Sequence, residues 1–317
     1  MNLSVDSPIS EAQSVVGLDP ISRSSTLTAQ TERDSSQAQA QTRREADAPK
    51  ADTGPRRYIY CIIDCDHEAH FAGIGIGATP EVFTIPYEGV AAAVSATRLN
   101  KFDISRGNML AHQRVMETMM QRGHTVLPVK FNTIAEDKAE RSAESRIIDQ
   151  VLVGRMNELS GLLATTKTRV ELGVKALWPD MDAVFRRIVS DNPKIKSLRS
   201  RLLAATRDGS ARPRSNLMGA HARLGEMVKN ALEARKGDAE KELTSRLAGI
   251  VADVRKNKTF GDAMFANLAL LVEKTRQEEI SSALSAFETE QDGQVKLRCI
   301  GPVPPSNFVE LVIQWDD

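Results

Sequence analysis

The sequence predicts an α+β protein of two domains behind a polar tail. The first domain is an N-terminal α/β sandwich of ferredoxin-like type, and the second is a C-terminal α+β domain with a long, coiled-coil-like helical hairpin. Strand-like runs alternate with two helical patterns over about one hundred residues, which indicates the sandwich. A charged stretch with apolar residues every three or four positions indicates the hairpin. A length of 317 residues suits two domains.

The predicted boundaries place a disordered polar tail at residues 1–56, the N-terminal domain at 57–165 and the C-terminal domain at 166–317, with the helical hairpin at about 181–257. The tail is rich in Ser, Thr, Gln and Ala and has few large apolar side chains. Burying so few apolar groups cannot offset the entropy lost on ordering, so disorder is expected there.

The strands of the N-terminal domain follow from β-branched, aromatic and apolar runs. Residues 58–63 have the density of a buried strand. A hairpin region is expected at 73–77 and 82–85, a further strand at 89–95, and another at 125–131.

Two helices are expected between and after these strands. Ser105 can cap the first, and Gly123 ends it. Its inner stripe is Met109, His112, Val115, Met116 and Met119. Residues 135–163 are charged and favour a second helix. Its inner stripe is Ile147, Val151, Leu152 and Leu159.

The C-terminal domain begins with alternating apolar residues at 169–178, which predict a strand with one solvated face that Pro179 stops. The chain from 181 to 257 is then predicted helical, with an interruption near 208–213. Two seams have the spacing of packed helices. They are Leu217, His221, Leu224, Val228 and Ala231, and then Leu243, Leu247, Ile250 and Val254.

Three further elements complete this domain. The apolar run at 264–272 is compatible with a buried strand or a buried helix, and a strand is the interpretation adopted here. A helix is expected at 274–289 and a strand at 294–300.

Composition restricts the function. Lys and Arg together number 42, and Asp and Glu together also number 42, so the formal net charge is zero. No overall charge therefore draws the chain to nucleic acid or an anionic membrane. The 4% aromatic content disfavours stacking platforms for single-stranded nucleic acid. Cys61, Cys65 and Cys299 are too few for a disulfide framework, and we expect free, buried thiols in a reducing cytosol. The sequence shows no secretory signal and no stretch of roughly 20 apolar residues, which favours a cytoplasmic protein.

One cluster has metal-ligating chemistry. Cys65, His67 and His70 lie beside Asp64, Asp66 and Glu68, and thiolate, imidazole and carboxylate are the ligand types of zinc. A metal-dependent enzyme is therefore an alternative. A polar loop is favoured, because no second ligand cluster follows at a zinc-finger spacing.

Other catalytic signals are weak. His112 lacks a nominated nucleophile and orienting group, so a hydrogen-bonded structural histidine between helix and sheet is favoured over a general base. The glycines at 73–77 lack the spacing of a phosphate-binding fingerprint. No Walker lysine motif or nucleophile elbow is present. We therefore expect no enzyme and no cofactor.

The segment 194–214 is basic, with one acid, Asp208. Its cations are Lys194, Lys196, Arg199, Arg201, Arg207, Arg212 and Arg214. Nucleic-acid binding is an alternative here. A solvated helical face, or a patch for an acidic protein partner, is favoured because no recognition helix or aromatic ladder accompanies the cations.

Two segments rich in backbone-specifying residues stand out, at 125–133 (TVLPVKFNT) and 301–309 (GPVPPSNFV). Proline fixes φ and donates no ladder hydrogen bond, and glycine adopts φ values closed to other residues. Together with YIYCII at 58–63, they resemble the gas vesicle accessory proteins of the F and L type. The chain has Lys130, Asn132, Val303 and Ser306 where that family usually has Arg, Gly, Trp and Tyr.

The resemblance implies a non-enzymatic, cytoplasmic protein of gas vesicle organisation and assembly, the process that gives microbes buoyancy. Such a protein is a minor vesicle component or an assembly factor that binds the hydrophobic major shell protein, and other accessory proteins are further partners. It limits aggregation of the shell protein during vesicle nucleation. No nucleic acid, membrane, metal or cofactor is expected. The motif residues expected to bind a partner or define the fold are Leu127, Pro128, Lys130, Phe131, Gly301, Pro302, Pro304, Pro305 and Phe308.

Overall fold

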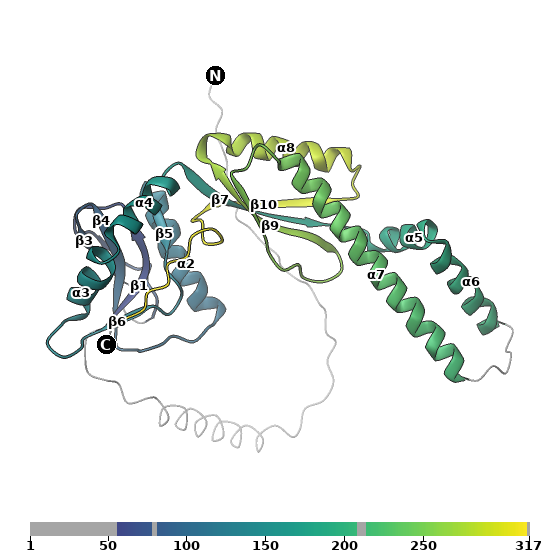
Figure 1. The fold of residues 1–317 in the computed structure, drawn as a ribbon, viewed down its shortest axis with the longest axis horizontal. Coiled ribbons are helices and arrows are strands. Elements are labelled where there is room, and N and C mark those ends of the chain that lie inside the picture. The colour runs from purple at the N-terminus through teal and green to yellow at the C-terminus, as the bar shows by residue number, and fades with distance from the viewer. Residues whose placement is uncertain (1–55, 78–80, 208–213, 316–317) are drawn as a thin grey trace, which may run out of the picture. The chain divides into compact units, whose positions relative to one another are not determined.

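The computed structural model describes residues 56–77, 81–207 and 214–315, without the side chains of 207 and 214–216. It has two antiparallel sheets and helices that pack against them (Figure 1). The predicted tail lies outside the described residues except for Arg56, which begins the first strand. Within the described part of the chain, no helix is long and apolar enough to cross a membrane.

The first sheet has the strand order β2-β3-β4-β1-β5, and β6 pairs with β1 beside β5. The central strand β1 (Arg56–Ile63) is the run predicted from its β-branched and aromatic residues. The strands around it are β2 (His70–Phe71), β3 (Val82–Tyr87), β4 (Val90–Thr97), β5 (Val126–Pro128) and β6 (Ile134–Glu136). The predicted strand at 89–95 is confirmed, whereas the loop at 73–77 is not part of a strand. The first helix follows four strands, so this element order differs from the βαββαβ order of a ferredoxin-like sandwich.

A β-bulge in β1 sends successive side chains to the same face. The pairing with β4 shifts between Ile59 and Cys61, so Tyr60 and Cys61 both enter the core on one side of the sheet. Ile59 and Ile62 enter the core on the other side. The sheet is therefore buried on both faces.

Helix α2 (Arg106–Gln121) covers the face with the tyrosines and buries His112, Val115, Met116 and Met119 of the predicted stripe, whereas Met109 is 44% exposed. Ser105 caps it, because its side chain accepts the N–H of Asn108 at 3.2 Å. Gly123 has φ +94, the left-handed conformation that ends helices. Both predicted ends are confirmed.

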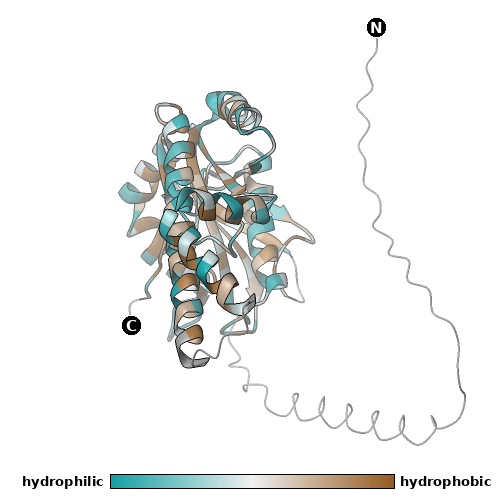
Figure 2. Ribbon diagram, turned by 90° about the vertical axis from the view of Figure 1, so that its right-hand side faces the viewer, coloured by the Kyte–Doolittle hydropathy of each residue, from teal (hydrophilic) through white to brown (hydrophobic). Residues whose placement is uncertain are grey.

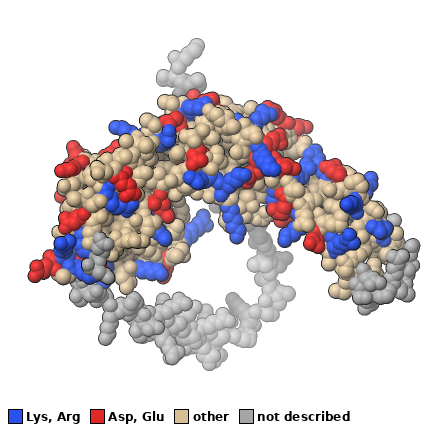
Figure 3. Space-filling model, viewed as in Figure 1, with Lys and Arg blue, Asp and Glu red and all other residues tan. Residues whose placement is uncertain are grey.

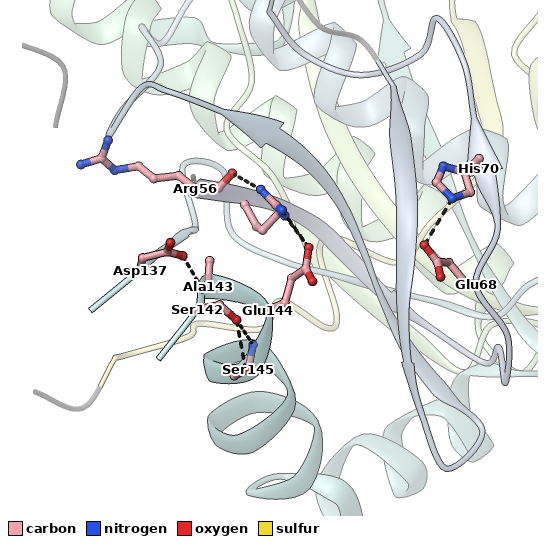
Figure 4. Close-up of polar contacts among 9 residues, drawn as sticks. Arg56, Glu68, His70, Asp137, Ser142, Ala143, Glu144 and Ser145 are labelled. Atoms are coloured by element: carbon pink, nitrogen blue, oxygen red, sulfur yellow. Dashed lines mark hydrogen bonds and ion pairs between the residues drawn. The ribbon is translucent and has the colours of Figure 1, made fainter. Parts of the chain in front are cut away.

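The opposite face is covered by α3 (Ala143–Arg146), a π-helical segment η1 (Ile147–Val153) and α4 (Met156–Thr166). The predicted single helix over 135–163 is wrong at its start. Residues 134–136 pair with β1 as β6. The helix begins only after Ser142, whose Oγ accepts the Ser145 N–H at 3.1 Å, while Asp137 accepts the Ala143 N–H at 2.7 Å (Figure 4).

The second sheet has the order β10-β7-β9-β8. Its strands are β7 (Arg169–Leu177), β8 (Asp253–Lys256), β9 (Met264–Glu273) and β10 (Lys296–Val303). The ambiguous apolar run is thus a strand, as predicted. Helix α8 (Gln277–Glu290), which follows a short turn η2 (Lys274–Arg276), buries Ile280, Leu284 and Phe287 in the same core.

Helices α5 (Met181–Asp191), α6 (Pro193–Arg207) and α7 (Arg214–Leu247) pack against one another. The strands are largely apolar, whereas these helices have polar and apolar residues in alternation (Figure 2). The predicted helix to residue 257 is wrong at its end. Gly249 has φ +83 and ends the helical region, and Val254 then pairs with Leu270 in the sheet. Leu243 and Leu247 are buried as the seam predicts.

Candidate functional site

The two motif segments of the sequence meet in the structure, because the C-terminal segment 304–315 follows β10 and packs on the first sheet. Leu311 forms a parallel bridge with Val129. Its N–H donates to the Pro128 carbonyl at 2.8 Å, and its carbonyl accepts the Lys130 N–H at 3.1 Å. Leu311 is buried in the same core as Leu127. The C-terminal segment therefore covers the edge of the first sheet beyond β5.

Side chains near the end of this segment fix it further. The guanidinium of Arg155 donates to the Val312 carbonyl at 3.1 Å. The guanidinium of Arg146 lies 5.2 Å from the centre of the Trp315 ring, within the range of a cation–π contact. The last described residues are thus anchored on the helices that cover the first sheet.

A buried carboxylate holds the start of this segment, just after β10. Glu171 of β7 is 5% exposed, and it accepts the backbone N–H of Asn307 at 2.9 Å and its side-chain Nδ2 at 2.5 Å. Burial raises the pKa of Glu171 above its ordinary value, and the two hydrogen bonds oppose this effect. The sequence did not indicate this pair, because its partners are 136 residues apart.

Gly301 is required by its surroundings. Its φ is +129, and a Cβ there would lie 2.8 Å from the Glu171 carbonyl oxygen and 3.0 Å from Leu172 Cδ2. The pairing of β10 with β7 shifts between Ile300 and Val303, around this glycine. Gly301 thus allows β10 to approach the backbone of β7 closely.

The nine predicted motif residues differ in exposure. Leu127, Pro128, Pro304 and Pro305 are buried, which fits a role in defining the fold. Lys130, Gly301 and Pro302 are exposed, while Phe131 and Phe308 are half-buried. The Phe308 ring lies 5.9 Å from the guanidinium carbon of Arg255. Their role in binding a partner stays a prediction.

The edge strand β10 presents apolar surface that the sequence analysis did not identify. Ile300 is 52% exposed. Cys299 is also exposed, so the expectation of three buried thiols is wrong for this residue and right for Cys61 and Cys65. The reason is the position of β10 at the edge of the sheet, where it pairs with β7 alone among the described strands.

The histidine on the inner stripe of α2 is structural, as predicted. His112 is 5% exposed, and its Nδ1 lies 2.9 Å from the hydroxyl of Tyr58, which also accepts the Asn132 N–H at 3.2 Å. Burial lowers the pKa of His112 to about 4 and raises the pKa of Tyr58, so both groups are neutral at pH 7. Phe131 packs against the imidazole ring with a centroid distance of 5.6 Å.

The side chains considered for the alternative metal site do not converge. His67 Nδ1 lies 2.9 Å from Asp66 and 3.7 Å from the Cys65 sulfur. His70 instead contacts Glu68 at 3.3 Å (Figure 4) and Glu81 at 3.1 Å. Within residues 56–77, 81–207 and 214–315, no group of three or more His, Cys, Asp and Glu side chains is placed to hold a metal ion. The polar-loop interpretation fits this geometry.

The basic segment lies mainly on α6. Lys194, Lys196, Arg199 and Arg201 are exposed there. The side chains of Arg207, Arg212 and Arg214, and the interruption at 208–213, lie outside the described residues.

Comparison with known proteins agrees with the resemblance seen in the motifs. The chain is 28% identical over 254 residues to gas vesicle protein F of Streptomyces sp. (strain CB03234), which covers 80% of this chain and 99% of that protein. It is 24% identical to gas vesicle protein F1 of Halobacterium salinarum, over 81% of this chain and 93% of that one. Gas vesicle protein L1 of the same organism is 23% identical over 80% of this chain and 89% of its own length.

Two solved structures share the fold. The crystal structure of the gas vesicle protein GvpF from Anabaena sp. PCC7120 matches with a TM-score of 0.66 and 20% identity, over 81% of this chain and 99% of that chain. That of GvpF from Microcystis aeruginosa matches with a TM-score of 0.60 and 21% identity, over the same shares. The family model of the gas vesicle synthesis protein GvpL/GvpF matches residues 56–310. The chain therefore belongs to the GvpL/GvpF family of gas vesicle proteins.

Proposed function

We propose that this chain is a non-enzymatic accessory protein of gas vesicle assembly that binds the hydrophobic major shell protein and limits its aggregation during nucleation. Membership of the GvpL/GvpF family is the observation that supports this proposal most. A shell monomer that polymerises through apolar surface is prone to aggregate before nucleation, and a soluble binder that covers this surface suppresses aggregation. The protein acts in the cytoplasm, at the gas vesicle.

The β10 edge is the surface that fits an apolar, strand-forming partner best. Of the outer strands, β2 has 2 residues, β6 has 3, β8 has 4, and β5 has 3 and is followed by the bridge to Leu311. β10 has 8 residues, long enough to template a strand by backbone pairing. Exposed Ile300 offers apolar contact, while Pro302 and the cations Lys296 and Arg298 discourage unspecific pairing at this edge.

The proposal is tested by co-expressing the full chain with the major shell protein, followed by affinity capture and a measurement of soluble shell protein. We expect capture, and more soluble shell protein than without the chain. Ile300→Asp should weaken capture, because it places a charge on the apolar edge. Leu99→Asp is the matched control, since Leu99 is 48% exposed and Ile300 52%. Absence of capture by the unaltered chain, with soluble shell protein present, would reject the proposal.

We further propose that residues 57–165 and 166–317 form two folding domains, except that the last segment of the chain belongs to the first of them. The C-terminal segment 304–315 packs on the first sheet, so it belongs with the N-terminal domain although it lies at the other end of the chain. Limited proteolysis of the full chain tests this. Cleavage between 165 and 169 should leave the two parts associated through this segment, and their separation under native conditions would contradict this assignment of the segment.

A further inference from the structure

The helical part of the chain contains an open groove that the proposed function does not use. It has a volume of about 560 Å³ and lies among α5, α6 and α7. Its apolar lining comes from all three helices, and includes Phe185, Val189, Leu202, Leu203, Leu224 and Val228. Leu203 is 50% exposed at this groove. Apolar surface that three helices present together and leave open is typical of a site for a partner.

The length of the groove along α6 suits a short helix. Its α6 lining runs from Ile195 to Thr206, which at 1.5 Å per residue is about 16 Å, or roughly three helical turns. Apolar side chains at i, i+3, i+4 and i+7 of a partner helix would contact such a floor along its length.

The α6 side of the groove is positively charged. Helix α6 has no Asp or Glu, and its exposed cations are Lys194, Lys196, Arg199 and Arg201. None of these four has an ion-pair partner among the residues that the structure describes. Of the four, Arg199 lines the groove itself, whereas Lys194 and Arg201 line a separate pocket together with Arg223. Lys and Arg side chains lie on the surface of this helical part (Figure 3).

On the opposite wall of the groove, the positive and negative charges balance. Arg186 of α5 lines the groove and lies 3.5 Å from Asp180, and Asp182 lines it as well. The unpaired positive charge in the lining of the groove is therefore that of Arg199 on α6.

We propose that this groove binds an amphipathic helix of a partner protein whose polar face is acidic. Its apolar face would cover the floor, and a carboxylate of its polar face would lie beside Arg199. This inference goes beyond the proposed function and is independent of it, because it concerns the helical groove and not the β10 edge.

Two other occupants fit the groove less well. A nucleic acid would use the cations but not the apolar floor, and among the described residues that line the groove Phe185 is the one Phe, Tyr or Trp. A second copy of the chain has an acidic helix in α8, with Glu278 and Glu279 in its first turn. The apolar stripe of α8, however, is buried in its own core.

The test uses the full chain and a fluorescein-labelled designed peptide of 14 residues. The peptide has Leu at i, i+3, i+4, i+7 and i+11 and mainly Glu and Ala elsewhere, and binding is read by fluorescence polarisation. One control peptide has Lys in place of every Glu, and another has the first composition in scrambled order. We expect the acidic peptide to bind at least roughly tenfold more tightly than either control.

Variants locate the site. Leu203→Glu should weaken binding of the acidic peptide by roughly tenfold or more, since it removes apolar contact and adds a like charge. Leu110→Glu is the matched control, because Leu110 is also an exposed helical leucine, 48% against 50%, and it should have no effect. Arg199→Glu should weaken the acidic peptide and strengthen the Lys peptide. Circular dichroism of each variant checks that it is folded.

Several outcomes would overturn the proposal. They are equal binding of the acidic and Lys peptides, no binding at millimolar peptide, and a Leu203→Glu variant that binds like the unaltered chain. Tighter binding of a DNA duplex that Arg199→Glu abolishes and Leu203→Glu leaves intact would assign the cations to nucleic acid instead. Self-association of the chain that Leu203→Glu abolishes would assign the groove to a second copy.

Discussion

Replacing Asn307 by Ala is expected to weaken the attachment of the C-terminal segment, and the structure sets the magnitude. The substitution removes the hydrogen bond from Asn307 Nδ2 to Glu171, which spans 2.5 Å, and keeps the backbone bond of 2.9 Å. A hydrogen bond to a charged group contributes about 1.5–3 kcal/mol. Asn307 is exposed, so water can replace the lost donor in part. We therefore expect the free energy of unfolding to fall by about 1.5 kcal/mol.

Urea denaturation of the full chain at pH 7 measures this loss, and a constant m-value shows that the denatured state is unchanged. Ser306→Ala is the control, because Ser306 is the exposed neighbour and its hydroxyl makes no hydrogen bond to another described residue. It should change stability by less than about 0.5 kcal/mol.

The Glu171→Gln variant separates the effect of charge from that of shape. Burial raises the pKa of Glu171 above its ordinary value of 4.5, so the folded chain holds this proton more tightly than the unfolded chain. The corresponding stability is fully present below pH 4.5 and is lost as the pH rises through the folded pKa. Glu171→Gln should abolish this pH dependence, and Asn307→Ala should cost less in the Glu171→Gln background.

The reasoning is refuted if Asn307→Ala costs no more than Ser306→Ala at pH 7. It is also refuted if Asn307→Ala costs the same in the Glu171→Gln background as in the unaltered chain, because the hydrogen bond would then not depend on the carboxylate.

Three further predictions concern residues of the same region. Gly301→Ala should destabilise the fold by more than about 2 kcal/mol, because the strain of a positive φ adds to a 2.8 Å contact between the new Cβ and the backbone. The control Gly293→Ala should cost about 1 kcal/mol, because Gly293 has φ +74 but nothing within 4 Å of a Cβ. Similar losses for the two variants in urea denaturation would contradict this. The pKa of His112 is lowered from 6.5 to about 4, so stability should be complete above pH 6.5 and fall by about 3 kcal/mol as the pH drops to 4. His112→Gln should show less of this dependence in thermal melts from pH 4 to 7, and an unchanged slope would rule out the histidine as its cause. Leu127→Ala should cost about 2–5 kcal/mol, since Leu127 is 0% exposed in the core, and a loss below about 1 kcal/mol would show that the core collapses around the cavity.

The sequence predicts the two segments that form much of the candidate surface, but not that they come together. Proline, glycine and apolar residues at 125–133 and 301–309 identified both motifs. These segments lie side by side because Val129 forms a bridge with Leu311, two residues beyond the second motif, and because Val309 packs against the core that contains Leu127; both contacts join residues far apart in the chain. No local pattern encodes such a pairing.

By itself, the sequence determined the elements whose cause is local. Ser105 and Gly123 mark the ends of α2, because capping and positive φ involve a few adjacent residues. The buried stripe of α2 follows from periodicity, whereas the apolar run of β9 is compatible with a buried strand or a buried helix on periodicity alone.

Only the tertiary structure decided which residues beyond these join a sheet or lie at its edge. Residues 253–256 continue a helical pattern, yet they pair with β9 as β8 once Gly249 reverses the chain. Residues 134–136 likewise pair with β1, and Cys299 is exposed because β10 lies at the sheet edge. For residues 134–136 and 253–256 the physical reason is the same: backbone pairing with another strand outweighs a local propensity that is worth less than about 1 kcal/mol per residue. For Cys299 the reason is the place of β10 in the order of the strands, which no local pattern encodes.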